Sequence, residues 1–156
     1  MYSVRQARRG DLAFMQYLFY ELNRFHHESM PGYYKTPEEV LKDKSLQAYV
    51  SKDSCFGFVG EYDGTPVGFA VGQVSELISP ISKRIKMGSV DEIFVLPKHR
   101  GFGLGKMLLQ SIETECRRLG ASDLFVETWS FNESALKFYE DFGLLPHVYW
   151  SRKPLT

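Results

Sequence analysis

A glycine-rich, basic turn between an apolar strand and an apolar helix is the part of the sequence best suited to bind a ligand. The apolar run ends at Pro97, and Gly101, Gly103 and Gly105 alternate in the turn that follows. Glycines let several backbone N–H groups face one small volume, and a helix start adds unpaired N–H groups and a positive dipole end. The turn therefore predicts a phosphate or pyrophosphate site. Its cationic or titratable side chains are Lys98, His99, Arg100 and Lys106.

Two common nucleotide-binding motifs do not fit this turn. The dinucleotide fingerprint G-x-G-x-x-G would need its third glycine at Lys106 or Leu108, and a P-loop would need Ser or Thr at Met107. An NAD-linked enzyme is therefore disfavoured. A tight turn without a ligand remains the structural alternative, although three alternating glycines beside several basic residues exceed what a turn requires.

A second segment, residues 125–143, supports the prediction of a ligand site made from the glycine turn. Its characteristic residues are Asn132, Ala135, Phe138, Tyr139, Glu140 and Gly143. With Arg100-x-x-Gly103-x-Gly105, it resembles the GCN5-related N-acetyltransferase (GNAT) family, in which Q/R-x-x-G-x-G/A follows the fourth strand and N-x-x-A-x-x-F/L-Y-E-x-x-G-F follows later. Leu144 replaces the last Phe of that pattern, a departure that concerns packing. The resemblance covers roughly residues 86–146.

The resemblance implies acetyl-CoA as co-substrate and no metal. In the family, CoA enters between splayed fourth and fifth strands and places its pyrophosphate on the glycine turn. A backbone N–H at the position of Val95 faces the thioester carbonyl, and Asn132 would help hold the CoA arm. The residues expected to bind CoA are Phe94, Val95, Arg100, Gly101, Phe102, Gly103, Leu104, Gly105, Lys106, Asn132 and Lys137.

Tyr139 is the candidate general acid, because the family's Tyr at this position protonates the departing CoA thiolate. A phenol with a pKa of ~10 suits that transfer. The alternative is a packing role. Ala135, Phe138 and Phe142 share one helical face, and a half-buried Tyr at the edge of such a face usually ties its hydroxyl to a carbonyl.

Asp91 and Glu92 are the candidates for the general base. Adjacent residues of a regular strand point to opposite faces, so only one of them is expected to enter the pocket. Polyamine-type acetyltransferases carry an acidic pair at this point, and this resemblance favours Asp91. The alternative is that one carboxylate pairs with a basic surface residue.

The acceptor site is expected at the end of the first helix and in the loop from His26 to Lys35. Its predicted residues are Glu21, His26, His27, Glu28, Tyr33, Tyr34 and Trp129. Carboxylates attract a cationic amine and aromatic faces hold it, so we expect the acceptor to be a small cationic primary amine that attacks acetyl-CoA directly. The alternatives are a protein N-terminal or lysine acetyltransferase, or a non-catalytic acyl-CoA-binding sensor. The paired histidines lack further ligands at a spacing that would support a metal site.

Composition indicates one domain over residues 1–156. Nineteen basic and nineteen acidic residues cancel, which gives no support for a nucleic-acid partner. No apolar run approaches the ~18 residues of a membrane span, and the N-terminus lacks the apolar core of a signal peptide. Cys55 and Cys116 are isolated, so we expect a reduced, cytoplasmic setting.

Strands and helices that would position these residues follow from turn signals and apolar periodicity. The expected strands are Tyr2 to Ala7, Cys55 to Tyr62, Val67 to Val74, Lys86 to Leu96, Ser122 to Thr128 and His147 to Arg152. Helices are expected from an N-cap at Asp11 and from the capping box at Thr36, then from Gly105 to Leu119 and from Glu133 to Phe142. This order predicts an α/β fold of the GNAT type, with a mixed, mostly antiparallel sheet and helices on both faces. The aromatic last strand could pair with a second copy in a homodimer.

Overall fold

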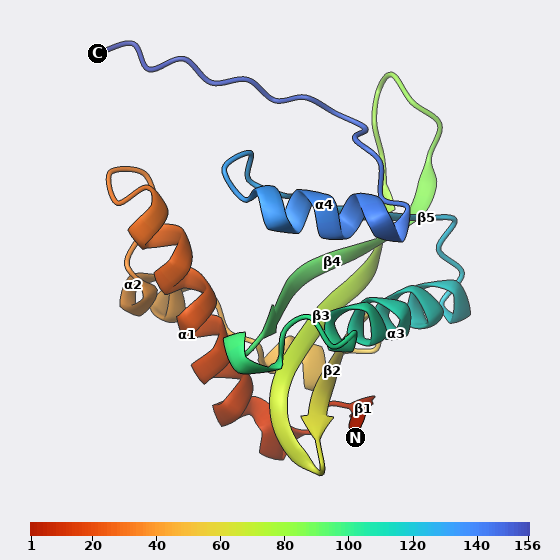
Figure 1. Cartoon of the computed structure of the whole chain (residues 1–156). Helices are drawn as coiled ribbons and strands as arrows, with labels where there is room; N and C mark the ends of the chain where they lie inside the picture. Colours follow the sequence, from red (N-terminus) through yellow and green to blue (C-terminus); the bar gives the residue numbers. More distant parts are fainter.

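A computed structural model describes all 156 residues and contains one five-stranded sheet in the order β1-β2-β3-β4-β5 (Figure 1). The strands are β1 (Tyr2–Gln6), β2 (Cys55–Tyr62), β3 (Thr65–Leu77), β4 (Ile85–Val95) and β5 (Asp123–Val126). Neighbours from β1 to β4 pair antiparallel, and β5 pairs with β4 in parallel. The predicted mixed, mostly antiparallel sheet is therefore confirmed.

Helices cover both faces of the sheet, as predicted (Figure 1). They are α1 (Leu12–Ser29), α2 (Pro37–Asp43), α3 (Leu104–Arg118) and α4 (Glu133–Phe142), with short 3-10 turns η1 (Arg9–Asp11), η2 (Gln47–Val50) and η3 (Pro97–His99). Helix α1 and turn η2 pack on one face, whereas α3 and α4 pack on the other. None of the helices combines the length and the hydropathy that a membrane span requires.

The side-chain alternation of β3 divides the interior into two cores. Ala70 faces α3, while Phe69 and Val71 face α1, because successive strand residues point to opposite faces. Helix α3 presents Leu108 and Ile112 four residues apart, and both are fully buried. Burial of each such side chain stabilises the fold by about 1.5–3 kcal/mol. The sheet is thus held rigidly between the two helical layers.

Helix starts confirm one predicted cap and correct another. At α2, Thr36 Oγ1 accepts the Glu39 N–H and the Glu39 carboxylate accepts the Thr36 N–H, which is the predicted capping box. Asp11 precedes α1 but does not cap it through its side chain. Its carboxylate instead accepts the Arg8 N–H and pairs with the Arg5 guanidinium at 2.9 Å, so a competing cation explains the difference.

Strands β4 and β5 diverge, and this divergence creates the opening of the candidate site. Residues Met87 to Val90 of β4 pair with the whole of β5, and the pairing stops there. The rest of β4, from Asp91 to Val95, keeps β3 on one side and has no strand on the other. The predicted splay of the fourth and fifth strands is therefore present.

The predicted last strand, His147 to Arg152, is wrong. Helix α4 ends at Gly143 with a left-handed backbone, and the chain beyond it forms no strand and extends away from the sheet (Figure 1). Leu145 and Trp150 are 70% and 94% exposed. Aromatic and branched residues fit a strand, but a strand also needs a neighbour for its N–H and C=O groups, and here the tail has none.

Candidate active site

The free edge of β4 presents backbone N–H groups to the opening. The Leu96 N–H donates to the Val67 carbonyl at 2.9 Å, so these two residues form a hydrogen-bonded pair. In an antiparallel ladder the next pair, Val95 with Gly68, is not hydrogen-bonded and turns its N–H and C=O groups away from the partner strand. The same alternation turns the Ile93 N–H outward, a donor that was not predicted from the sequence.

The glycine turn leaves the space in front of its backbone open. Gly101 and Gly103 have φ angles of +82° and +88°, a left-handed region that other residues rarely adopt. A Cβ atom built on either glycine would meet no other atom within 4 Å. Gly103 is the residue before α3, and Leu104 is 1% exposed in the core. The first N–H groups of α3 therefore face this open space while a buried side chain anchors them.

Arg100 ties the glycine turn to the end of β4. Its Nε donates to the Val95 carbonyl at 2.8 Å, and its guanidinium lies 4.9 Å from the centre of the Phe94 ring. Burial lowers the pKa of Arg100. Because Val95 and Arg100 are joined in this way, the turn and the free edge of β4 form one rigid wall of the opening.

Other residues predicted to bind CoA lie in different settings. The Asn132 side-chain oxygen accepts the Ala135 N–H and so caps α4, which leaves its amide nitrogen without a protein partner. Phe102 is 65% exposed and stacks on Tyr2 with 5.8 Å between ring centres. Lys106 is exposed, and Lys137 pairs with Asp141 on the surface of α4.

Tyr139 is buried, but its hydroxyl has no hydrogen-bond partner in the protein. The residue is 8% exposed, and no protein donor or acceptor contacts its oxygen. Burial raises the pKa of Tyr139, and the charge of Glu92 raises it further. The expected bond of a packing Tyr to a carbonyl is therefore wrong here. Neighbouring Phe138 packs 3.4 Å from the Cβ position of Gly105, which fixes α4 against the start of α3.

A bulge in β4 places both candidate bases on one face. Val71 pairs with Glu92 and Gly72 pairs with Val90, so Asp91 is an extra residue with no partner on β3. Asp91 and Glu92 both contact groups on the α1 and η2 side of the sheet, through Tyr49 and Lys44 respectively. The expectation that only one carboxylate faces that side is wrong, because it assumed a regular strand.

The two carboxylates differ in their partners. Asp91 accepts hydrogen bonds from Tyr49 Oη at 2.6 Å, Ser89 Oγ at 2.6 Å and Gln73 Nε2 at 2.8 Å. Glu92 accepts only from Lys44 Nζ, through Oε1 at 2.9 Å, and Oε2 contacts no donor. Burial raises the pKa of Glu92, although Lys44 opposes the shift. Asp91 is thus saturated by neutral donors, whereas Glu92 keeps an oxygen available to accept a proton.

Four of the predicted acceptor residues meet with Phe131 in an aromatic cluster, which we define as His26, Tyr33, Tyr34, Trp129 and Phe131. The rings of Tyr33, Tyr34 and Trp129 lie at steep angles to one another, with centres 4.9–5.7 Å apart. His26 and Phe131 pack against Tyr34 at 5.7 and 5.9 Å. The cluster joins the end of α1 and the segment before α2 to the loop between β5 and α4. Phe131 was not predicted, because its place depends on that loop.

Polar groups within the aromatic cluster are partly unpaired. The Tyr34 hydroxyl is buried without a hydrogen-bond partner, and burial raises the pKa of Tyr34 to about 12. Burial lowers the pKa of His26. His27 contacts the Tyr34 carbonyl through Nδ1 at 2.9 Å, which holds the segment against α1. His26 and His27 belong to the last turn of α1, not to a loop as predicted.

The two predicted acidic residues of the acceptor region lie outside the aromatic cluster. Glu21 is on α1 and pairs with Arg24 one turn further along, so its charge is balanced locally. Glu28 is exposed near the end of α1. Asp91 and Glu92 supply negative charge from β4, just beyond the last residue of that strand that pairs with β5.

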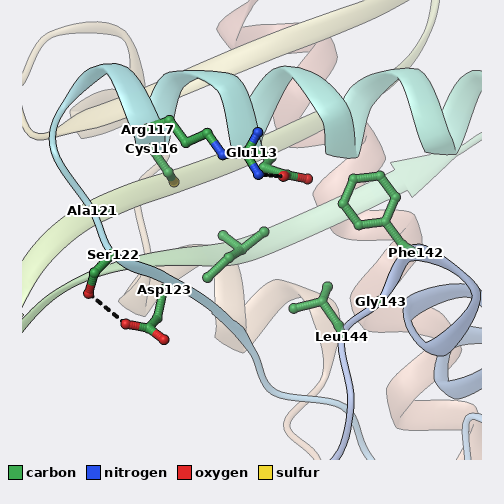
Figure 2. A pocket seen from close by; sticks show the side chains of 10 residues that line it. Glu113, Cys116, Arg117, Ala121, Ser122, Asp123, Phe142, Gly143 and Leu144 are labelled. Carbon is green, nitrogen blue, oxygen red and sulfur yellow. Dashed lines mark hydrogen bonds and ion pairs between the residues drawn. The ribbon is translucent and has the colours of Figure 1, made fainter.

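A separate hollow of about 250 Å³ lies between the end of α3, the start of β5 and the end of α4 (Figure 2). Cys116 and Leu124 are among the residues that line it, and Glu113 pairs with Arg117 on its α3 side. Phe142 closes one side in Figure 2. None of the residues that line this hollow was predicted to bind CoA or an acceptor.

Comparisons with known proteins agree with this fold. An uncharacterised N-acetyltransferase of Methanocaldococcus jannaschii is 30% identical over 148 residues, which are 91% of this chain and 60% of that protein. The chain therefore spans less than two thirds of that relative. The BH1408 protein of Bacillus halodurans, crystallised as a mutant, shares the fold with a TM-score of 0.86 at 17% identity, over 99% of both chains.

A solved aminoglycoside N-acetyltransferase in complex with CoA also has this fold, with a TM-score of 0.72 and 21% identity over 98% of this chain and 95% of that one. The family model described as the acetyltransferase (GNAT) family matches residues 19–144. This match includes most of α1, the bulged strand β4, the glycine turn and α4. The chain belongs to the GNAT acetyltransferase family.

Proposed function

We propose that this chain transfers an acetyl group from acetyl-CoA to the primary amine of a small cationic acceptor by direct attack. The observation that carries the proposal is the placement of Tyr139 and Glu92. Tyr139 packs in the same core as Val95 on the α4 side of the sheet, whereas Glu92 contacts Lys44 on the α1 side. Both groups have an atom free for proton transfer, and they flank the free edge of β4.

The glycine turn has the properties that a CoA pyrophosphate requires. The space in front of Gly101 and Gly103 is open, and the first N–H groups of α3 point into it. Arg100 adds a positive charge, although its Nε is committed to Val95. The related aminoglycoside N-acetyltransferase was solved with CoA, which supports acetyl-CoA as the donor here.

The proposed reaction follows from the groups around the opening. A primary amine with a pKa of ~10.4 is neutral in about one molecule in a few thousand at pH 7, so it must lose a proton before it attacks. Glu92 Oε2 accepts this proton, directly or through a water molecule. The amine nitrogen then forms a bond to the thioester carbon, and the N–H of Ile93 or Val95 stabilises the oxyanion. The C–S bond breaks, the thiolate takes the Tyr139 proton, and the attacking nitrogen loses its second proton, which restores the Tyr139 hydroxyl through water.

The aromatic cluster supports a cationic acceptor. Tyr33 already presents its ring face to a cation, because the Arg152 guanidinium lies 4.9 Å from its centre. The buried Tyr34 hydroxyl lacks a partner and is available to a polar group of the acceptor once the rings part. Aminoglycosides carry several amines, so the related aminoglycoside enzyme points to the same acceptor chemistry.

A screen of acceptors tests the proposed function. CoA release is measured with polyamines, aminoglycosides, lysine analogues, neutral amines, acidic amino acids and short peptides. We expect the highest kcat/KM with small cationic amines. A clear preference for peptides would indicate a protein acetyltransferase, and a preference for anionic amines would contradict the cationic acceptor. Acetyl-CoA binding without turnover on any amine would indicate an acyl-CoA sensor.

A further inference from the structure

Lys44 holds a charged nitrogen beside the proposed base. It is the residue that follows α2, and its Nζ lies 2.9 Å from Glu92 Oε1. The same nitrogen lies 5.5 Å from the centre of the Phe19 ring and 5.9 Å from that of Tyr49. The Lys44 side chain is 38% exposed and that of Glu92 is 19% exposed. The ammonium is therefore held in one place by an anion and two ring faces.

We infer that Lys44 is a positioning residue for the proposed reaction: it keeps Glu92 ionised and fixes its orientation so that Oε2 faces the acceptor amine. The inference rests on the proposed function, in which Glu92 is the base. Lys44 itself touches neither acetyl-CoA nor the reacting atoms in this scheme. It acts through the carboxylate that it binds.

The charges around Glu92 explain why such a cation is needed. The neighbouring Asp91 lies on the same face because of the bulge, and a like charge disfavours a second ionised carboxylate. The other titratable groups that face Glu92 are the hydroxyls of Tyr49, from η2, and Tyr139, from α4. Neither supplies positive charge. Lys44 forms the one ion pair that either carboxylate makes, so its removal would leave Glu92 buried without a counterion.

The position of Lys44 is set by α2, which also borders the acceptor region. Thr36 starts this helix with a capping box, and Lys35 pairs with Asp43 at 2.7 Å across its length. Tyr34, in the aromatic cluster, lies immediately before Lys35. One short helix therefore joins the proposed acceptor cluster at its start to the proposed base at its end.

Three variants test this role. Lys44→Met removes the charge but keeps an apolar stem of similar length over Phe19 and Tyr49. Lys44→Arg keeps the charge. Lys42→Met is the matched control, because Lys42 is exposed on the same helix and forms no ion pair. Circular dichroism establishes that each variant is folded.

The first measurement is the pKa of Glu92 in the protein without substrates, by carboxyl ¹³C NMR, with the resonance assigned from Glu92→Gln. We expect Lys44→Met to raise this pKa, and Lys44→Arg and Lys42→Met to leave it close to that of the unmutated protein. The second measurement is kcat/KM against pH. The acid limb of Lys44→Met should move to higher pH by the same amount, which lowers activity about tenfold for each unit at low pH.

Different results would contradict the positioning role of Lys44 and the role of Glu92 as the base. An unchanged Glu92 pKa in folded Lys44→Met would overturn the role of Lys44, whatever the activity. A raised Glu92 pKa without any shift of the pH–rate profile would overturn it as well, because Lys44 would then act on a group that does not limit the reaction. Near-normal turnover in Glu92→Gln would instead contradict the proposed base.

Discussion

Asp91 and Glu92 are adjacent on β4, yet both carboxylates lie on the face of the sheet that α1 and η2 cover. The bulge at Asp91 causes this arrangement, because it adds one residue between the pairs Gly72–Val90 and Val71–Glu92. The two acids then acquire different surroundings. Asp91 binds three neutral donors, and Glu92 binds one lysine. This difference assigns them different roles in the proposed reaction.

Substitution of the two acids should separate these roles. Glu92→Gln is expected to lower kcat/KM by roughly 10²–10⁴-fold, because a general base is lost while the side-chain shape is kept. Asp91→Ala leaves the Tyr49 and Ser89 hydroxyls without their acceptor and should lower the free energy of unfolding by about 1–3 kcal/mol. Urea unfolding and steady-state kinetics measure both effects. If Asp91→Asn abolishes turnover in a stable protein and Glu92→Gln does not, the assignment is reversed.

Substitution of Gly103 in the glycine turn should weaken acetyl-CoA binding selectively. Gly103→Ala places a methyl group in the open space at the start of α3, and we expect affinity to fall about tenfold or more, since a charge-assisted hydrogen bond is worth ~1.5–3 kcal/mol. Gly64→Ala is the matched control. Gly64 has a φ of +81° and an equally open Cβ position in the β2–β3 hairpin, so both variants carry a similar strain of about 1–2 kcal/mol. Calorimetry that finds equal affinity in the two variants would remove the turn from the CoA site.

The pKa values of Glu92 and Tyr139 predict the pH dependence of turnover. Burial raises the pKa of Glu92, so the base ionises at a higher pH than an exposed glutamate and the acid limb moves upward. Burial also raises the pKa of Tyr139, so its hydroxyl keeps its proton in alkaline solution. We therefore expect kcat/KM to rise from neutral to alkaline pH as the acceptor amine loses its proton. A decline near the ordinary Tyr pKa of about 10 would show that Tyr139 is not shifted as described.

Substitution of Trp129 tests whether the aromatic cluster binds the acceptor. Trp129→Ala removes one ring of the aromatic cluster and should raise the KM for a cationic amine by roughly 2–30-fold, the range expected for a lost cation–π contact. Affinity for acetyl-CoA should stay unchanged. Trp150→Ala is the matched control, because Trp150 is 94% exposed in the tail. An equal KM in both variants would place the acceptor elsewhere.

Local signals allowed much of the fold to be predicted. The bounds of β2 and α4 agree with the sequence analysis, because Asp63-Gly64 ends the strand and Asn132 and Gly143 bracket the helix. The glycine turn and the capping box at Thr36 are also local features, and each is present. Family motifs confined to short segments indicated the mixed sheet and its splay.

Features that depend on distant residues could not be predicted. The bulge at Asp91 depends on the pairing register with β3. Strand alternation alone predicted that Asp91 and Glu92 point to opposite faces of the sheet, whereas both lie on one face. Lys44 reaches Glu92 across 48 positions of sequence, and Phe131 joins the aromatic cluster through a loop. The strand expected at His147 to Arg152 failed for the same reason, since its formation requires a partner that lies outside its own sequence.

Turnover of Tyr139→Phe, compared with Tyr149→Phe, tests whether Tyr139 delivers its proton to the CoA thiolate. Tyr139 is buried with a free hydroxyl, whereas Tyr149 is 87% exposed in the tail, so the same atom is removed inside and outside the proposed site. CoA release with a preferred cationic amine is measured under conditions in which chemistry limits the rate, with acetyl-CoA affinity measured in parallel. We expect Tyr139→Phe to bind acetyl-CoA normally and to lose roughly 10²–10⁴-fold in kcat, while Tyr149→Phe is unchanged. Near-normal kcat in Tyr139→Phe would contradict the proposed proton transfer.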